Sequence, residues 1–184
     1  LFATDGRFYT IPCSKLPSGR GFGEPLRLMT GLSNEHNIIS LFIYKPGEKI
    51  LVASNSGRGF VVKTDEIYAQ TKSGKQVLNI KENEISIACC KVEGDHVAVI
   101  GSNRKLLLFP LEEVPEMSRG RGVIFQRYNK GGLADVKTFY LKEGLNWQSG
   151  ERVRTELNVK EWIGKRAQAG KNAPKGFSRK NRFS

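Results

Sequence analysis

Short apolar strands alternate with polar turns along this chain, and the same arrangement returns several times. Each copy opens with two strand-like runs joined by a polar turn rich in glycine, asparagine and serine, a pattern typical of a β-hairpin. The predicted hairpins span residues 1–9, 50–62, 97–109 and 145–154. The copies therefore begin with the same structural unit.

The turns of these hairpins carry residues that suit a backbone with positive φ. Gly6, Gly57 and Gly150 stand in the turns of the first, second and fourth copies. In the third copy Asn103 can tolerate the same conformation. We therefore expect tight turns of the two-residue kind.

The second half of each copy holds a short helical turn and then a glycine beside Lys or Arg. The helical turns end near Leu16, Ile67, Val114 and Ile163. The glycines that follow are Gly19, Gly74, Gly120 and Gly170, spaced by 55, 46 and 50 residues. Two markers that recur four times in the same order indicate a repeat protein with a period of roughly fifty residues.

Further strand-like runs complete the repeats, at residues 38–44, 85–92 and 133–141. Together with the hairpins they give about four strands a repeat, which is the content of a propeller blade. We therefore expect an all-β, propeller-like fold of about four repeats. Their approximate bounds are 1–49, 50–96, 97–144 and 145–184.

The end of the chain predicts a short helix and a basic tail. Asn158 can cap the helix, and Glu161 follows three residues later, ahead of Trp162. Residues 172–184 are polar and basic, so we expect this tail to be extended or disordered.

The excess of positive charge along the chain indicates what kind of partner it binds. The chain has 30 Lys and Arg residues against 18 Asp and Glu, a formal charge of +12, and residues 165–184 contain seven basic residues and no acidic one. Such an excess favours a polyanionic partner such as nucleic acid. A tail that only keeps the protein soluble is the alternative for its last part.

The basic residues at the recurring turns are the candidate nucleic-acid contacts. Cations at equivalent points of a repeat form a continuous belt, which can contact phosphates without reading base sequence. The predicted DNA-binding residues are Arg7, Arg20, Arg58, Lys75, Arg104, Lys105, Arg119, Arg121, Arg152 and Lys171. Any one of them alone could equally be a solvated turn cation.

Histidines and cysteines give no indication of a catalytic or metal site. His36 and His96 are the only histidines, and neither has a second ligand at metal spacing. Cys13, Cys89 and Cys90 lack the spacing of a metal site and the even count of a disulfide framework, which favours a reducing cytoplasm. We expect no cofactor in this domain, and a nuclease or other hydrolase is the least supported interpretation.

Several longer stretches are similar to a known family. They include residues 1–10 (LFATDGRFYT), 15–29 (KLPSGRGFGEPLRLM), 57–62 (GRGFVV), 94–99 (GDHVAV), 104–110 (RKLLLFP), 126–133 (QRYNKGGL), 161–164 (EWIG) and 174–177 (PKGF). These stretches resemble the C-terminal domain of the A subunit of bacterial DNA topoisomerase IV, a relative of the gyrase A C-terminal domain. The resemblance covers essentially the whole chain.

This resemblance implies a β-pinwheel, a disc whose blades exchange strands and whose basic rim binds and bends duplex DNA. Such a domain would present duplex segments to a type IIA topoisomerase that decatenates and relaxes DNA, with no cleavage chemistry of its own. The implied partners are double-stranded DNA and the B subunit of topoisomerase IV, in an A2B2 heterotetramer that uses ATP and Mg²⁺ elsewhere. The isolated domain would be a monomer, and the enzyme would be bacterial, cytoplasmic and nucleoid-associated.

Two departures from the family pattern leave alternatives open. The glutamine-arginine-arginine-glycine-glycine-lysine-glycine box of gyrase A is missing from this sequence, which favours topoisomerase IV over a gyrase wrapping domain. The family usually has at least one more blade upstream, so we expect an N-terminally truncated fragment and leave closure of the disc open. A basic propeller that binds an acidic protein remains the alternative from another functional class.

Overall fold

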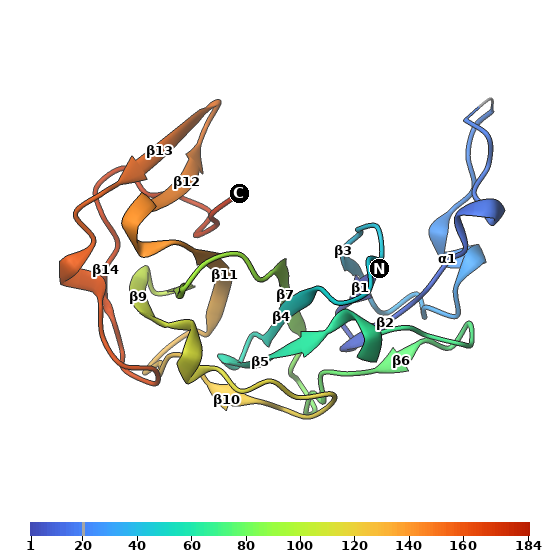
Figure 1. The fold of residues 1–184 in the computed structure, drawn as a ribbon, viewed down its shortest axis with the longest axis horizontal. Coiled ribbons are helices and arrows are strands. Elements are labelled where there is room, and N and C mark those ends of the chain that lie inside the picture. Colours follow the sequence, from blue (N-terminus) through green and yellow to red (C-terminus); the bar gives the residue numbers. More distant parts are fainter. Residues whose placement is uncertain (20) are drawn as a thin grey trace.

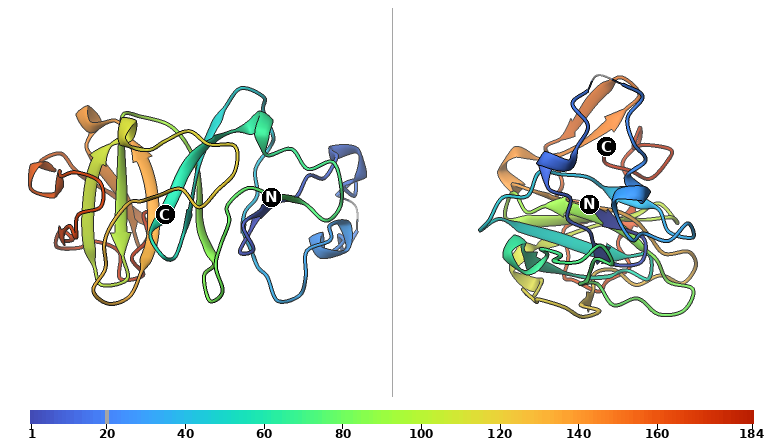
Figure 2. Two further views of the ribbon diagram at one scale, coloured as in Figure 1. Left: turned by 90° about the horizontal axis from the view of Figure 1, so that it is seen from below. Right: turned by 90° about the vertical axis from the view of Figure 1, so that its right-hand side faces the viewer.

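The chain folds into antiparallel sheets that stand side by side along an open arc (Figure 1). The structure is a computed structural model and describes residues 1–19 and 21–184. Seen from below, the strands of neighbouring sheets run in nearly the same direction, like blades standing on edge (Figure 2). The predicted all-β fold of four repeats is confirmed.

Each repeat centres on one of the predicted hairpins. The first sheet has the order β3-β1-β2-β6 and contains β1 (Phe2–Ala3), β2 (Arg7–Phe8), β3 (Ile38–Ser40) and β6 (Lys75–Gln76). The second has the order β10-β5-β4-β7, with β4 (Lys49–Ser54), β5 (Arg58–Lys63), β7 (Ser86–Lys91) and β10 (Val123–Ile124). The third has the order β11-β8-β9-β14, with β8 (His96–Gly101), β9 (Lys105–Pro110), β11 (Leu133–Phe139) and β14 (Lys171–Asn172). The fourth is the hairpin of β12 (Leu145–Ser149) and β13 (Arg152–Glu156).

The helical turns of the repeats are short 3-10 helices. They are η1 (Cys13–Lys15), η2 (Thr64–Glu66), η3 (Leu111–Glu113) and η5 (Lys160–Trp162). These four end directly before Leu16, Ile67, Val114 and Ile163, where the sequence predicts the turns to end. A further 3-10 helix, η4 (Leu141–Glu143), and a single α-helical turn, α1 (Leu26–Met29), are not predicted by the repeat pattern.

Three sheets receive their outermost strand from the following repeat. Strand β6 belongs to the second repeat but pairs with β2, with Lys75 opposite Phe8. Strand β10 pairs with β5, and β14 pairs with β9, in the same way. This exchange covers edges that would otherwise be open to other chains. The repeat bounds at 1–49, 50–96, 97–144 and 145–184 therefore separate the hairpins but not the sheets.

Three of the four hairpin turns are one residue longer than predicted. The N–H groups of Gly6, Gly57 and Arg104 close these turns onto the last residue of the preceding strand at 3.0 Å. Their φ angles are 75°, 79° and 61°, which is the bulged three-residue turn. In the third copy the extra residue moves the positive φ from Asn103 to Arg104, so the prediction for Asn103 is wrong. Gly150, with φ 65°, lies in the one turn of two residues.

A glycine precedes each exchanged strand and lets two segments approach closely. Gly74, Gly122 and Gly170 have φ of 74°, 69° and 77° and are spaced by 48 residues. A Cβ atom at each would lie 2.0 to 2.8 Å from a carbonyl oxygen of the hairpin strand beside it. The third marker is therefore Gly122, and the prediction of Gly120 is wrong because only the glycine next to the paired strand needs this geometry.

Alternation along each strand divides the core into layers between neighbouring sheets. In β4, Ile50 and Val52 pack with Phe2 of the first sheet. Leu51 and Ala53 point to the other side and pack with residues of the third sheet. Central strands are therefore apolar on both faces, which explains why they read as continuous hydrophobic runs in the sequence.

The helix predicted near the C-terminus is only the 3-10 turn η5. Val159 precedes it, and no side chain caps it, so the capping role predicted for Asn158 is wrong. The residue before the turn is a buried valine, 3 % exposed, that packs with the core of the fourth sheet. Hydrophobic packing, rather than a cap, holds this turn in place.

The basic tail at residues 172–184 is packed, contrary to the expectation of an extended or disordered end. Phe177 and Phe183 are 3 % and 4 % exposed and belong to the same apolar cluster as Trp147 of β12. The fourth sheet has only two strands of its own, so the tail fills the position beside β12. The prediction from composition failed because two aromatic residues outweigh the surrounding charge.

Candidate nucleic-acid interface

The tips of all four hairpins lie on one face of the arc. Between the first two tips, the N–H of Ser86 donates to the Thr4 carbonyl. The carbonyl of Ile85, the residue before Ser86, accepts from the N–H of Asn55. Residues 132–133 join the second and third tips in the same way, and residues 181–183 join the third and fourth. The tips therefore form one continuous surface, which we call the tip face.

The first residue after each turn is basic in every repeat. These residues are Arg7 in β2, Arg58 in β5, Lys105 in β9 and Arg152 in β13, and we call them the tip row. Because the hairpins are structurally equivalent, the four cations occur once per blade along the tip face. A row of this kind can follow the phosphates of a curved duplex.

The first two members of the tip row are held by residues just before the exchanged strands β6 and β10. Arg7 Nη1 donates to the Ser73 carbonyl at 3.3 Å, and Arg58 Nη1 donates to the Gly122 carbonyl at 3.2 Å. Both side chains are partly exposed, so their guanidinium groups keep donors for another acceptor. Lys105 and Arg152 have no ion pair among the described residues.

Three more of the predicted residues lie in or near the exchanged strands β6, β10 and β14, which form one edge of their sheets and which we call the outer edge. Lys75 approaches Glu66 at 3.9 Å, a weak pair between exposed groups. Arg119 donates from Nε to Asn79 Oδ1 at 3.3 Å and is otherwise exposed, and Lys171 is exposed at the start of β14. These three side chains extend the basic surface away from the tip row.

Two predicted residues are engaged within the protein instead. Arg121 Nη2 donates to both carboxylate oxygens of Glu84, at 2.7 and 2.9 Å, and the arginine side chain is 31 % exposed. Arg104 donates to the carbonyls of Phe177 and Ser178 in the C-terminal segment. Both contacts are long-range in sequence, so the residue pattern could not reveal them. The remaining predicted residue, Arg20, lies outside the described residues.

Acidic residues gather at the opposite ends of the strands. The segments that flank β4, β5, β8 and β9 there contain Glu48, Asp65, Glu66, Glu93, Asp95, Glu112, Glu113 and Glu116, eight of the 18 acidic residues. Several pair with lysines of the same end, such as Glu116 with Lys49 and Lys63 at 2.7 and 3.3 Å. The excess positive charge is therefore concentrated on the tip face and the outer edge.

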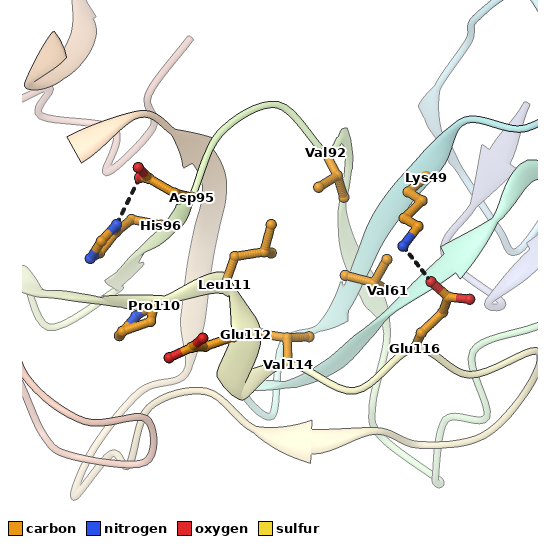
Figure 3. A pocket seen from close by; sticks show the side chains of 10 residues that line it. All are labelled: Lys49, Val61, Val92, Asp95, His96, Pro110, Leu111, Glu112, Val114 and Glu116. Carbon is orange, nitrogen blue, oxygen red and sulfur yellow. Dashed lines mark hydrogen bonds and ion pairs between the residues drawn. The ribbon is translucent and has the colours of Figure 1, made fainter. Parts of the chain in front are cut away.

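A cleft of about 610 Å³ opens on this acidic side, between the second and third sheets (Figure 3). Its walls include Val61 and Leu111. Two pairs of its polar groups interact with each other: Asp95 Oδ1 lies 2.8 Å from His96 Nδ1, and Lys49 pairs with Glu116. The hydrogen bond from His96 lowers the pKa of Asp95. Nothing in the cleft combines a nucleophile with a general base.

The two adjacent cysteines pack within the fold, whereas Cys13 is exposed. Cys89 and Cys90 are free thiols that point to opposite faces of β7, and burial raises the pKa of Cys90 to about 12. Within residues 1–19 and 21–184, no three His, Cys, Asp or Glu side chains come together as a metal site. No helix of the described part of the chain is long and apolar enough to cross a membrane.

Cations of the tip face that are missing from the predicted set include Arg154 in β13, and Arg179 and Lys180 in the C-terminal segment. The period-two spacing of Arg152 and Arg154 could have indicated the first. The other two belong to the run interpreted as a loose tail. Phe177 and Phe183, the aromatic residues in that run, were the available indication that it packs.

Comparison with known proteins agrees with this architecture. The family model described as "DNA gyrase C-terminal domain, beta-propeller" matches residues 48–85 and 95–134, in the second and third repeats. The A subunit of DNA topoisomerase 4 from Caulobacter vibrioides is 48 % identical over 184 residues, covering 100 % of this chain and 24 % of that protein. The same protein of Rickettsia bellii is 43 % identical, covering 100 % of this chain and 25 % of that protein. The structure titled "Structure of the E. coli ParC C-terminal domain" superposes with a TM-score of 0.82 at 25 % identity, covering 97 % of this chain and 76 % of that one.

The exchange of strands between blades and the similarity to these relatives together define a β-pinwheel. The chain belongs to the gyrase A C-terminal domain family. Within that family it groups with the C-terminal domains of the DNA topoisomerase IV A subunit. The chain spans about a quarter of the length of these relatives.

Proposed function

We propose that this domain binds duplex DNA through its tip face and outer edge and presents DNA segments to a topoisomerase IV. The observation that supports this most directly is the tip row, in which one basic residue recurs at the same place in every blade. Acidic residues collect at the other end of the strands. Recurrence at equivalent positions favours a shaped path for a polyanion over general solubility.

The binding mode follows from the chemistry of the row. Arg and Lys head groups on neighbouring blades contact phosphates, and these contacts carry no base information. Each phosphate that is neutralised releases counterions, so affinity falls steeply with salt. An arc of blades with cations along one face also favours a bent duplex, because a straight duplex reaches fewer of them.

In the whole enzyme, the domain would select and hold duplex segments for decatenation and relaxation of DNA. Cleavage would belong to the N-terminal region of the A subunit and ATP hydrolysis to the B subunit, with Mg²⁺ used there. The A and B subunits would form an A2B2 heterotetramer on the bacterial nucleoid, and this domain would need no cofactor.

The test is the topology of nicked circular DNA sealed by ligase in the presence of this chain. Bending or wrapping by the domain shifts the distribution of linking number, and the proposal predicts such a shift together with salt-sensitive gel retardation of linear duplex. A chain that neither shifts topology nor binds duplex except at very low salt would instead support the protein-interaction alternative. Plasmid incubated with the chain and Mg²⁺ should remain uncut.

A further inference from the structure

The C-terminal segment 173–184 is fastened to the tip face by its aromatic residues. The rings of Trp147 and Phe177 have centroids 5.2 Å apart, and those of Phe177 and Phe183 are 5.5 Å apart. Both phenylalanines are almost completely buried. The segment therefore has two fixed points in the core between the third and fourth sheets.

Polar contacts fix the backbone beside and between these two phenylalanines. Trp147 Nε1 donates to the Gly176 carbonyl at 3.2 Å, and the Gln148 N–H donates to the Phe183 carbonyl at 2.8 Å. On the other side, Arg104 Nη1 donates to the Ser178 carbonyl at 3.2 Å. The segment thus bridges the third and fourth hairpins near their tips.

Arg179 and Lys180 stand at the apex of a turn in this bridge. The Asn181 N–H donates to the Ser178 carbonyl at 3.1 Å, and Asn181 has φ 52°, so the turn is closed around the two basic residues. Asn181 Nδ2 also donates to the Ser102 carbonyl in the third hairpin turn at 3.3 Å. Both basic side chains are exposed, and their backbone is held on the tip face.

Strand β13 places two more cations beside this turn. Arg152 and Arg154 are both exposed, and the Arg154 guanidinium packs over Gly176 of the bridging segment. Glu151 is the one acidic residue of the adjacent turn. Arg182 forms an ion pair within the chain, with its Nη1 atom 3.8 Å from Oδ1 of the buried Asp135. Four exposed cations therefore face solvent together at the end of the arc.

We propose that Arg152, Arg154, Arg179 and Lys180 form a phosphate-binding patch on the fourth blade, which we call the tail patch. It continues the tip row and requires the C-terminal segment to be docked. This inference rests on the proposed binding of duplex DNA and adds the place where the duplex leaves the arc. A docked turn loses little conformational freedom when it binds a phosphate, whereas a loose tail would lose more.

Neutralising the turn should weaken DNA binding measurably. In Arg179→Gln/Lys180→Gln, two phosphate contacts are removed, so the slope of log affinity against log salt should become shallower by about 1.8, since each contact contributes about 0.9. If the variant and the wild type bind equally at 1 M salt, this change of slope corresponds to an affinity roughly 60-fold lower for the variant at 0.1 M salt. Fluorescence anisotropy with a short labelled duplex over a range of salt measures both quantities.

The matched control removes the same charge from the opposite end of the strands. Lys142 in η4 and Lys160 in η5 are exposed there, and Lys142→Gln/Lys160→Gln should leave the slope close to that of the wild type. If both double variants lose affinity equally, net charge explains the effect and the tail patch is refuted. If the Arg179/Lys180 variant binds like the wild type, the tail patch is refuted while the proposed function stands. If the wild type itself binds no duplex, the proposed function fails first.

A third variant tests whether docking matters. Phe183→Ala keeps every charge but removes one anchor of the segment. The slope of log affinity against log salt should therefore become shallower by the same amount as in Arg179→Gln/Lys180→Gln, and the segment should become open to protease. Circular dichroism establishes that the remainder stays folded. Cleavage of the released segment without any loss of DNA affinity would overturn the requirement for docking. Should the variant unfold, Asn181→Gly offers a milder release, since glycine tolerates the φ of 52° and only the side-chain hydrogen bonds with Ser102 and Arg104 are lost.

Discussion

Replacing Arg121 should destabilise the fold without removing a DNA contact. Its guanidinium holds both carboxylate oxygens of Glu84, at 2.7 and 2.9 Å, and the two side chains are only 31 % and 17 % exposed. A hydrogen bond between charged groups contributes about 1.5–3 kcal/mol. Allowing for partial exposure, we expect Arg121→Gln to lower the free energy of unfolding by about 1–2 kcal/mol. For a chain of this size, that corresponds to a fall in Tm of about 2–8 °C.

The pH dependence of this loss has a definite sign. Burial alone would raise the pKa of Glu84, but hydrogen bonds from the Lys81 N–H and from Arg121 outweigh it and hold the pKa below its ordinary value. The stabilisation is therefore present above the unfolded pKa of about 4.3 and is lost as the pH falls through the folded value. The difference in unfolding free energy between wild type and Arg121→Gln should shrink at low pH.

Arg119 is the natural control, because it lies two residues away and is exposed. Urea denaturation gives the stability of Arg119→Gln and Arg121→Gln, and fluorescence anisotropy gives their DNA affinity. We expect Arg119→Gln to weaken DNA binding with little change in stability, and Arg121→Gln to do the reverse. An Arg121→Gln protein with wild-type stability and a shallower salt slope would refute this reasoning.

Three further perturbations test the fold. Gly122→Ala should lower the free energy of unfolding by about 2–4 kcal/mol, because positive φ disfavours alanine and the added Cβ would meet a carbonyl oxygen. Gly150→Ala has open space around the added Cβ and should lower it by about 1 kcal/mol or less. Equal midpoints of urea denaturation for the two variants would contradict this. Burial raises the pKa of Asp135, so the free energy of unfolding should fall as pH rises above about 4, and Asp135→Asn should abolish that component of the pH profile. A thiol reagent should label the exposed Cys13 in the native state and Cys90 only after unfolding.

Local features of the fold could be predicted from the sequence because they depend on neighbouring residues. Alternation defines the hairpins, and the apolar residues after two of the 3-10 turns, Ile67 and Val114, are buried beside their hairpins. The turn of the third copy was misplaced because Arg104 adopts positive φ, at 61°, where glycine or asparagine is usual. One extra residue in a turn cannot be seen in composition alone.

Features that depend on distant partners could not be predicted. Strands β6, β10 and β14 have two residues each, too few for any periodicity, and they are recognisable only by the sheets that they join. Arg121 resembles the other turn cations in the sequence, because nothing there indicates that Glu84 lies beside it. The basic C-terminal segment likewise acquires its position only through the cavity that Phe177 and Phe183 fill.

The salt dependence of duplex binding by tip-row variants tests the central claim most directly. In Arg7→Gln/Arg58→Gln/Lys105→Gln, the slope of log affinity against log salt should become shallower by about 2.7, since each of the three phosphate contacts removed contributes about 0.9. The control Lys45→Gln/Lys142→Gln/Lys160→Gln removes equal charge at the opposite end of the strands and should keep the wild-type slope. An unchanged slope in the tip-row variant, or an equal fall in both, would contradict a DNA path along the tip face.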